Sequence, residues 1–193
     1  MSFWDVVLLT PPFLRLTYAV PAYLPSWSWH MGQRVCVPVG HTLRPGILWA
    51  ETLEKPDTAK TKPLFWPLEK KPLLSPGYLE LVQALATRYL VHPGQVLSTA
   101  LPSPFKTCKL QMEVTASSWA LKNRLTLEEV FRLGDEDLSS LAELWSADAA
   151  RLKVSASLQS ERVCVLNCDP PWPLRPNACR QMEILDFVWS KGS

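Results

Sequence analysis

Cysteine is the residue type in this sequence that is best suited to metal binding or covalent chemistry. The five cysteines of the 193-residue chain are Cys36, Cys108, Cys164, Cys168 and Cys179. Their odd number and loose spacing do not describe a disulfide framework. A zinc site built from the last three and one distant ligand is one interpretation. Reduced thiols in a cytoplasmic protein are the other, and we therefore expect no metal site.

Residues that could catalyse a reaction are scarce. The three histidines, His30, His41 and His92, lie in turn-like segments without acid–base partners nearby in the sequence. No glycine is followed by the lysine of a Walker A loop, and the motifs G-x-S-x-G and H-E-x-x-H do not occur. A small enzyme that uses Cys36 or Cys108 as its nucleophile would therefore lack a recognisable base. We expect no catalytic residue and no cofactor.

Aromatic and basic residues offer binding chemistry instead. Trp27 and Trp29 lie in a serine-containing loop near Arg34, where they could stack on nucleobases or fold back onto a sheet. Five lysines bracket the apolar residues 64–68, and lysines at strand ends can contact a phosphate backbone or simply be solvated. These lysines are Lys55, Lys60, Lys62, Lys70 and Lys71. The pattern indicates an anion-binding edge.

Charge and proline are distributed unevenly along the chain. The net charge is only +2, but residues 1–107 carry ten Lys and Arg against six Asp and Glu, whereas residues 108–193 carry ten against twelve. Fourteen of the eighteen prolines precede residue 108. Such a density disfavours long helices and favours short strands and turns. We therefore place a boundary near residue 107.

Short strands must position most of the candidate residues in the first part. Apolar or alternating segments predict strands over 3–9, 16–20, 34–39, 47–50 and 64–68. One main helix follows, with Ser75 as N-cap, Pro76 in its first turn and His92 beyond its end. A short helix over 95–100 comes after it. Residues 1–107 are thus expected to form a small β-rich, barrel-like domain with one main helix.

The sequence of the second part, residues 108–193, indicates more helix than the first part. A capping-box pattern, Thr126 with Glu129, begins one helix, and Asp135 caps another. A hairpin over 151–158 and 162–166 would follow. Helix, helix, hairpin is the order of winged-helix modules, although it also occurs in domains without a DNA role. We expect an α+β chain whose second domain, 108–170, is mostly helical, and whose residues 171–193 form a proline-rich connector and the start of a further domain.

Residues 14–21 read LRLTYAVP, and residues 32–40 read GQRVCVPVG. These segments resemble the patterns F-x-Y-x-x-P and G-x-R-V-x-V-P-F-G in the N-terminal region of the PriA family of replication-restart helicases. Residues 71–76, 92–97 and 100–102 are similar to P-L-L-T-P, P-x-G-E-V-L and A-L-P, in the family's order. The similarity extends over about the first hundred residues. The family's motor lobes would come later, so we expect an N-terminal fragment or a relative without the motor.

The resemblance implies a pocket for the terminal nucleotide of a DNA strand. Carried over position by position, this pocket involves Leu16, Thr17, Gly40 and Lys62. Glycine lets the backbone approach a sugar closely, and lysine neutralises a phosphate. The family often has an aromatic residue where Leu16 stands and an aspartate where Thr17 stands. Threonine keeps a hydrogen-bond acceptor there but lacks the charge.

The implied partner is branched or single-stranded DNA with a free 3′ end at a stalled replication fork. Other primosome proteins or single-stranded DNA-binding protein are further implied partners, and a membrane is not expected because the apolar segments are too short to cross one. The alternative interpretation is a protein–protein adaptor without DNA binding, which the acidic second part and the nine tryptophans would suit.

Overall fold

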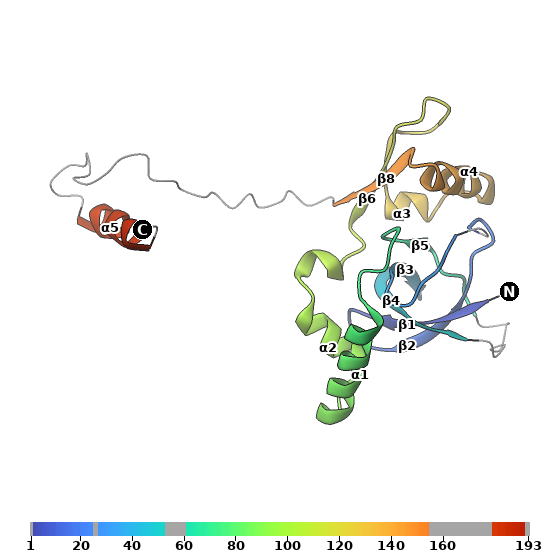
Figure 1. Cartoon of the computed structure of the whole chain (residues 1–193). Coiled ribbons are helices and arrows are strands. Elements are labelled where there is room, and N and C mark those ends of the chain that lie inside the picture. The colour runs from blue at the N-terminus through green and yellow to red at the C-terminus, as the bar shows by residue number, and fades with distance from the viewer. Residues whose placement is uncertain (1, 25–26, 53–60, 155–178, 192–193) are drawn as a thin grey trace. The chain divides into compact units, whose positions relative to one another are not determined.

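The computed structural model describes residues 2–24, 27–52, 61–154 and 179–191. The chain divides into two compact bodies, residues 1–156 and residues 157–193 (Figure 1). In its described part, the first body contains two antiparallel sheets with helices packed against them. The chain is therefore an α+β protein, as the sequence predicted.

A five-stranded antiparallel sheet organises the first hundred residues. Its order is β2-β1-β4-β3-β5. The strands are β1 (Phe3–Leu8), β2 (Arg15–Ala19), β3 (Arg34–Val39), β4 (Thr42–Thr52) and β5 (Trp66–Pro67). Each of the five predicted strand segments overlaps one of these strands, although β4 starts earlier than expected and β5 is much shorter.

Apolar residues cover both faces of this sheet. Val35 and Val37 of β3 enter one buried cluster, whereas Cys36 between them enters another. Val6 and Val7 of β1 likewise point to opposite sides, because successive side chains of a strand alternate between faces. This double burial explains why residues 3–9 are almost continuously apolar.

The sheet curls, but it does not close into a barrel. Its two outer strands, β2 and β5, are not paired with each other. Only an isolated parallel bridge, Ala19 with Pro63, links the β2 edge to the segment that precedes β5. The barrel-like expectation is therefore wrong for the described residues, because β5 has only two residues with which to complete a ladder.

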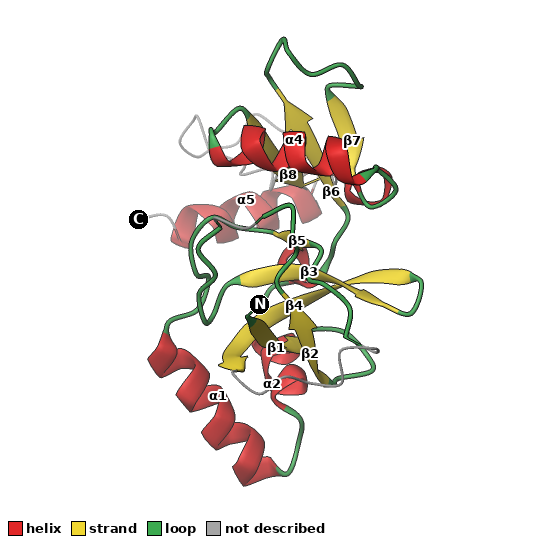
Figure 2. Cartoon of the chain, turned by 90° about the vertical axis from the view of Figure 1, so that its right-hand side faces the viewer, coloured by secondary structure: helices red, strands yellow, loops and turns green. Residues whose placement is uncertain are grey.

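Two helices cover one face of the sheet. The helix α1 (Pro76–Tyr89) begins at the predicted N-cap Ser75, whose side chain accepts a hydrogen bond from the Tyr78 amide, and α2 (Pro93–Ala100) follows. Leu79, Val82 and Leu97 pack with Ile47 of the sheet. Figure 2 shows α1 and α2 on the side of the sheet opposite to α4 and β8.

A three-stranded antiparallel sheet with two helices follows in residues 110–154. The order is β7-β6-β8, from β6 (Leu110–Val114), β7 (Arg124–Thr126) and β8 (Ala150–Val154). The helices are α3 (Leu127–Val130), which has the predicted capping box, and α4 (Asp135–Ser146). The N-cap of α4 is Gly134, so the prediction of Asp135 as its cap is wrong.

The winged-helix interpretation is not confirmed. The strand β8 pairs with β6, which precedes both helices, and the expected second hairpin strand lies outside the described residues. The prediction of a mostly helical second domain missed β6 and β7. In β6 the apolar residues alternate with polar ones, and Leu110, Met112 and Val114 are buried.

A single buried cluster joins the two sheets of the first body. Phe65 and Trp66 beside the first sheet pack with Met112 and Trp145 of the second part. The rings of Trp66 and Trp145 lie edge to face with centroids 6.2 Å apart, and those of Phe65 and Phe131 lie 5.0 Å apart. Such edge contacts are favourable because an aromatic ring has a positive edge and a negative face.

The described part of the second body is one helix, α5 (Cys179–Lys191). The expected proline-rich connector before this helix lies outside the described residues. Among the helices that the structure describes, none has the length and apolar character needed to span a membrane.

Candidate nucleic-acid interface

The outer strand β2 carries the first two predicted site residues. Its partner is β1, with Leu16 opposite Val6 and Thr17 opposite Asp5. Both Leu16 and Thr17 are half-buried, and Leu16 packs against the cluster that contains Val6 and Tyr18. At its other edge, among the described residues, β2 has one isolated bridge, from Ala19 to Pro63.

Gly40 forms the tight turn between β3 and β4. Its φ of +61° lies in the left-handed region, which is strained for residues that carry a side chain. A Cβ atom built at Gly40 would meet nothing within 4 Å, so the space around this residue is open. Glycine is therefore needed here for its backbone conformation, and it also leaves the turn accessible to a ligand.

Lys62 connects the two edges of the curled sheet. Its carbonyl oxygen accepts a hydrogen bond of 3.0 Å from the amide of Ala19 in β2. Its ammonium group donates a hydrogen bond of 2.9 Å to the carbonyl oxygen of Gly40. The backbone and side chain of one residue thus bring the β3–β4 turn next to β2.

These contacts enclose one small pocket of about 220 Å³. All four predicted residues line it, and three further residues complete the lining. The lining residues are Leu16, Thr17, Tyr18, Pro38, Val39, Gly40 and Lys62. The volume lies below the range typical of drug-sized ligands, about 300 to 1,000 Å³. The pocket therefore suits a small group, such as one end of a chain, better than a large cofactor.

Tyr18 is a pocket residue that the sequence reasoning did not select, although it belongs to the family-like segment 14–21. It is buried, and its hydroxyl group donates a hydrogen bond of 3.1 Å to the carbonyl oxygen of Pro38. Burial raises the pKa of Tyr18 to about 12, with a smaller contribution from Cys36. Tyr18 therefore remains protonated at neutral pH and ties β2 to β3 across the base of the pocket.

A network of three side chains lies along β2 and β1. The hydroxyl of Thr17 donates to Asp5 Oδ1 at 2.7 Å. Nε and Nη2 of Arg15 donate to Asp5 Oδ2 at 2.9 Å and 2.7 Å. Sequence reasoning missed Asp5 because no local pattern shows which residue of β1 stands opposite Thr17.

Lys70 and Lys71, the two other candidate lysines that the structure describes, do not line this pocket. Lys70 donates to the carbonyl oxygen of Trp145 at 2.7 Å and forms an ion pair with Asp148, which lowers the pKa of that carboxyl group. Its role is therefore to fasten α4 and its C-terminal turn to the loop after β5. Lys71 is exposed, and Lys55 and Lys60 lie outside the described residues.

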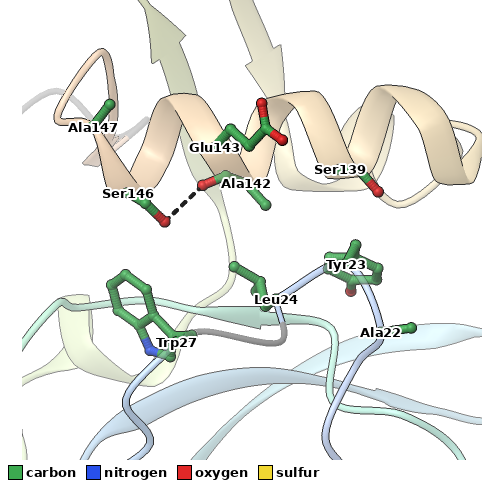
Figure 3. A pocket seen from close by; sticks show the side chains of 9 residues that line it. All are labelled: Ala22, Tyr23, Leu24, Trp27, Ser139, Ala142, Glu143, Ser146 and Ala147. Atoms are coloured by element: carbon green, nitrogen blue, oxygen red, sulfur yellow. Dashed lines mark hydrogen bonds between the residues drawn. The ribbon is translucent and has the colours of Figure 1, made fainter.

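The two loop tryptophans fold back onto the protein. Trp27 and Trp29 are half-buried and pack against the cluster that joins the two sheets. The Trp27 ring lies 6.2 Å from that of Trp145. Trp27 also borders a second pocket, about 610 Å³, in which it and Tyr23 face α4 (Figure 3). Glu143 is the charged residue of its lining, so this pocket does not suit a phosphate group.

Two of the cysteines, Cys36 and Cys108, and the histidine His92 have local structural contacts. The thiols of Cys36 and Cys108 lie 3.0 Å apart, and burial raises the pKa of Cys36. His92 caps α2 by accepting a hydrogen bond from the Gly94 amide. Within the described ranges, no group of three or more His, Cys, Asp or Glu side chains could hold a metal ion. Cys164 and Cys168 lie outside those ranges.

Comparison with known proteins gives one finding on family. The model of the 3′DNA-binding domain (3′BD) of PriA matches residues 5–102, slightly more than half of the chain. The matched segment contains every residue that lines the small pocket. No curated protein matches the chain significantly. The chain therefore belongs to the family of the PriA 3′ DNA-binding domain and carries a module that binds DNA with a 3′ end.

Proposed function

We propose that the pocket lined by Leu16, Thr17, Gly40 and Lys62 holds the terminal nucleotide of a DNA strand with a free 3′ end. The observation that carries this proposal is the convergence of the four residues, which are spread over some fifty positions of the sequence, on one pocket of about 220 Å³. The chain then acts by binding DNA, and residues of this pocket catalyse no step.

The chemistry of the lining supports a strand end as ligand. Lys62 uses one of its three N–H donors on Gly40, so two remain for a phosphate oxygen. The Thr17 oxygen can accept a hydrogen bond from a terminal hydroxyl group. Leu16 offers apolar surface to a sugar or base, without the stacking that an aromatic ring would provide. A terminal nucleotide carries all three complementary groups.

We infer that the biological ligand is the 3′ end of a nascent strand at a stalled replication fork. On this account residues 1–107 are the 3′-end-binding domain, residues 108–170 a second domain, and residues 171–193 a connector and the start of a further domain. Other primosome proteins or single-stranded DNA-binding protein are partners that we propose for the surfaces outside the pocket.

Fluorescence anisotropy with labelled forked DNA tests the proposal. We expect forks with a free 3′ hydroxyl to bind up to about tenfold more tightly than forks with a 3′ phosphate, the effect of about one hydrogen bond to the neutral Thr17 oxygen. Lys62→Ala should weaken binding and reduce the slope of log affinity against log salt by about 0.9, since one phosphate contact is lost. Lys71→Ala is the matched control, because Lys71 is exposed and does not line the pocket.

Two results would contradict the proposal. Equal affinity of the unmodified protein for both ends would mean that the pocket does not hold the terminus. If Lys62→Ala and Lys71→Ala weakened DNA binding equally, Lys62 would contribute only its positive charge and no specific contact in the pocket.

A further inference from the structure

Asp5 lies beside the pocket without lining it, and both of its carboxylate oxygens have partners. Oδ1 accepts from the Thr17 hydroxyl, and Oδ2 accepts from two nitrogens of Arg15. The Asp5 side chain is only 17% exposed, whereas that of Arg15 is 45% exposed. The carboxylate is therefore shielded from solvent by the two residues that it orients.

This contact fixes the hydrogen-bonding character of Thr17. A threonine hydroxyl has one proton to donate, and an ionised carboxylate can only accept. Because the proton of Thr17 is directed to Asp5, the hydroxyl oxygen has only its lone pairs to offer to a ligand in the pocket. Hydrogen bonds to a charged acceptor are stronger than neutral ones, so the opposite orientation of the hydroxyl is disfavoured.

We propose that Asp5 is a positioning residue that makes Thr17 an obligatory acceptor and thereby selects strand ends that carry a hydroxyl donor. This inference rests on the proposed function of the pocket. A 3′ hydroxyl can donate to Thr17. A terminal phosphate has oxygen atoms that cannot donate to the Thr17 oxygen, and it brings its negative charge close to Asp5. Binding of a phosphate end is therefore disfavoured.

Asp5→Asn is the informative substitution. Arg15 can only donate, so it should keep the oxygen of the introduced amide as its acceptor, and the amide nitrogen should then face Thr17. Thr17 would accept from this nitrogen and turn its own proton toward the pocket. The variant keeps the size of the side chain at position 5, but it changes the Thr17 hydroxyl from an acceptor to a donor toward the pocket.

The measurement is the ratio of dissociation constants for forks that end in a 3′ phosphate and in a 3′ hydroxyl, with the full chain. We expect Asp5→Asn to reduce this ratio by up to about tenfold, the effect of one hydrogen bond between the 3′ hydroxyl and Thr17. Thr17→Val should reduce it similarly, and the double variant should show no additional loss, because both changes remove the same interaction. Arg15→Gln, which leaves the Asp5–Thr17 bond in place, should preserve the ratio.

The outcomes separate this inference from the proposed function. If the unmodified protein prefers the hydroxyl end and Asp5→Asn weakens binding to both ends equally, the inference is wrong and the pocket stands. If the unmodified protein shows no preference, the proposed function fails as well. A poorly folded Asp5→Asn would leave Thr17→Val as the deciding variant, and an unchanged ratio in Thr17→Val would overturn the inference.

Discussion

Arg34 shows how a residue of a family-like motif serves the fold more than the pocket. Its side chain is buried, forms an ion pair of 2.5 Å with Glu69, and donates to the carbonyl oxygen of Phe105 at 2.9 Å. The guanidinium group also lies 5.2 Å from the centre of the Phe105 ring. These contacts hold the short 3-10 helix at Ser103–Lys106 against β3, far along the chain from Arg34.

Replacing Arg34 should leave a poorly compensated carboxylate. Burial raises the pKa of Glu69, and Arg34 opposes this rise. Arg34→Met should therefore reduce the free energy of unfolding by about 3 kcal/mol at neutral pH, as for other buried ion pairs that lose one partner. The pKa of Glu69 should rise further, so the loss should be smaller at pH values below that raised pKa, where Glu69 is protonated, and grow as the pH rises through it.

Urea denaturation at several pH values measures this effect. Arg88→Met is the control, since Arg88 is exposed in the last turn of α1. Equal stability losses for Arg34→Met at acidic and neutral pH would contradict the coupling to Glu69.

At the scale of elements, Gly32 is the junction between the sheet and the segment that leads into α1. Its amide donates to the carbonyl oxygen of Leu48 at 2.8 Å, and its own carbonyl oxygen accepts from the amides of Leu73 and Leu74. Its φ is +82°, and a Cβ atom would lie 2.0 Å from the carbonyl oxygen of Leu74. Both the conformation and the space exclude a side chain at this position.

Gly32→Ala should destabilise the protein strongly. The left-handed conformation alone costs about 1 to 2 kcal/mol for alanine, and the clash with Leu74 adds to it. Gly77→Ala is the matched control, because a Cβ atom meets nothing within 4 Å there and helical alanine is favoured over glycine by about 1 kcal/mol. Thermal unfolding should show a lower midpoint for the first variant and an unchanged or higher one for the second. The reverse order would contradict this assignment.

Elements with local signals could be predicted from the sequence, whereas the partners that they choose could not. The N-cap Ser75 and the capping box at Thr126 follow from short-range patterns, and both are present. The pairing of β6 with β8 joins residues about forty positions apart, and no local pattern specifies it. The candidate site could likewise be predicted only in part. Its four residues came from a resemblance, but Asp5 and Tyr18 required knowledge of strand register and burial.

At the scale of the whole molecule, residues 1–107 share a core with residues that follow them. Trp66, Phe65 and Leu68 are buried in the cluster that also contains Met112 and Trp145. The Lys70 side chain adds a hydrogen bond and an ion pair across the same junction. The proposed boundary at residue 107 therefore separates the DNA-binding residues from the residues that follow, but both parts pack together as one unit.

A fragment of residues 1–107 should be less stable than one of residues 1–156. Full burial of a large apolar side chain contributes about 1.5 to 3 kcal/mol, so exposure of Phe65 and Trp66 should reduce the free energy of unfolding by at least about 3 kcal/mol. Chemical denaturation of both fragments, followed by tryptophan fluorescence, measures the difference. Equal unfolding midpoints would show that residues 1–107 fold independently of the second sheet.

The central claim, that a strand terminus occupies the pocket beside Gly40, is tested most directly by amide chemical shifts. A short single-stranded oligonucleotide with a free 3′ hydroxyl would be titrated into the isotope-labelled protein, and a 3′-phosphorylated strand of the same sequence would serve as comparison. The largest shift changes are expected at Thr17, Tyr18, Gly40 and Lys62, and they should be much weaker with the phosphorylated strand. Changes that gather at α4 or α5, or that are identical for the two strands, would contradict the account.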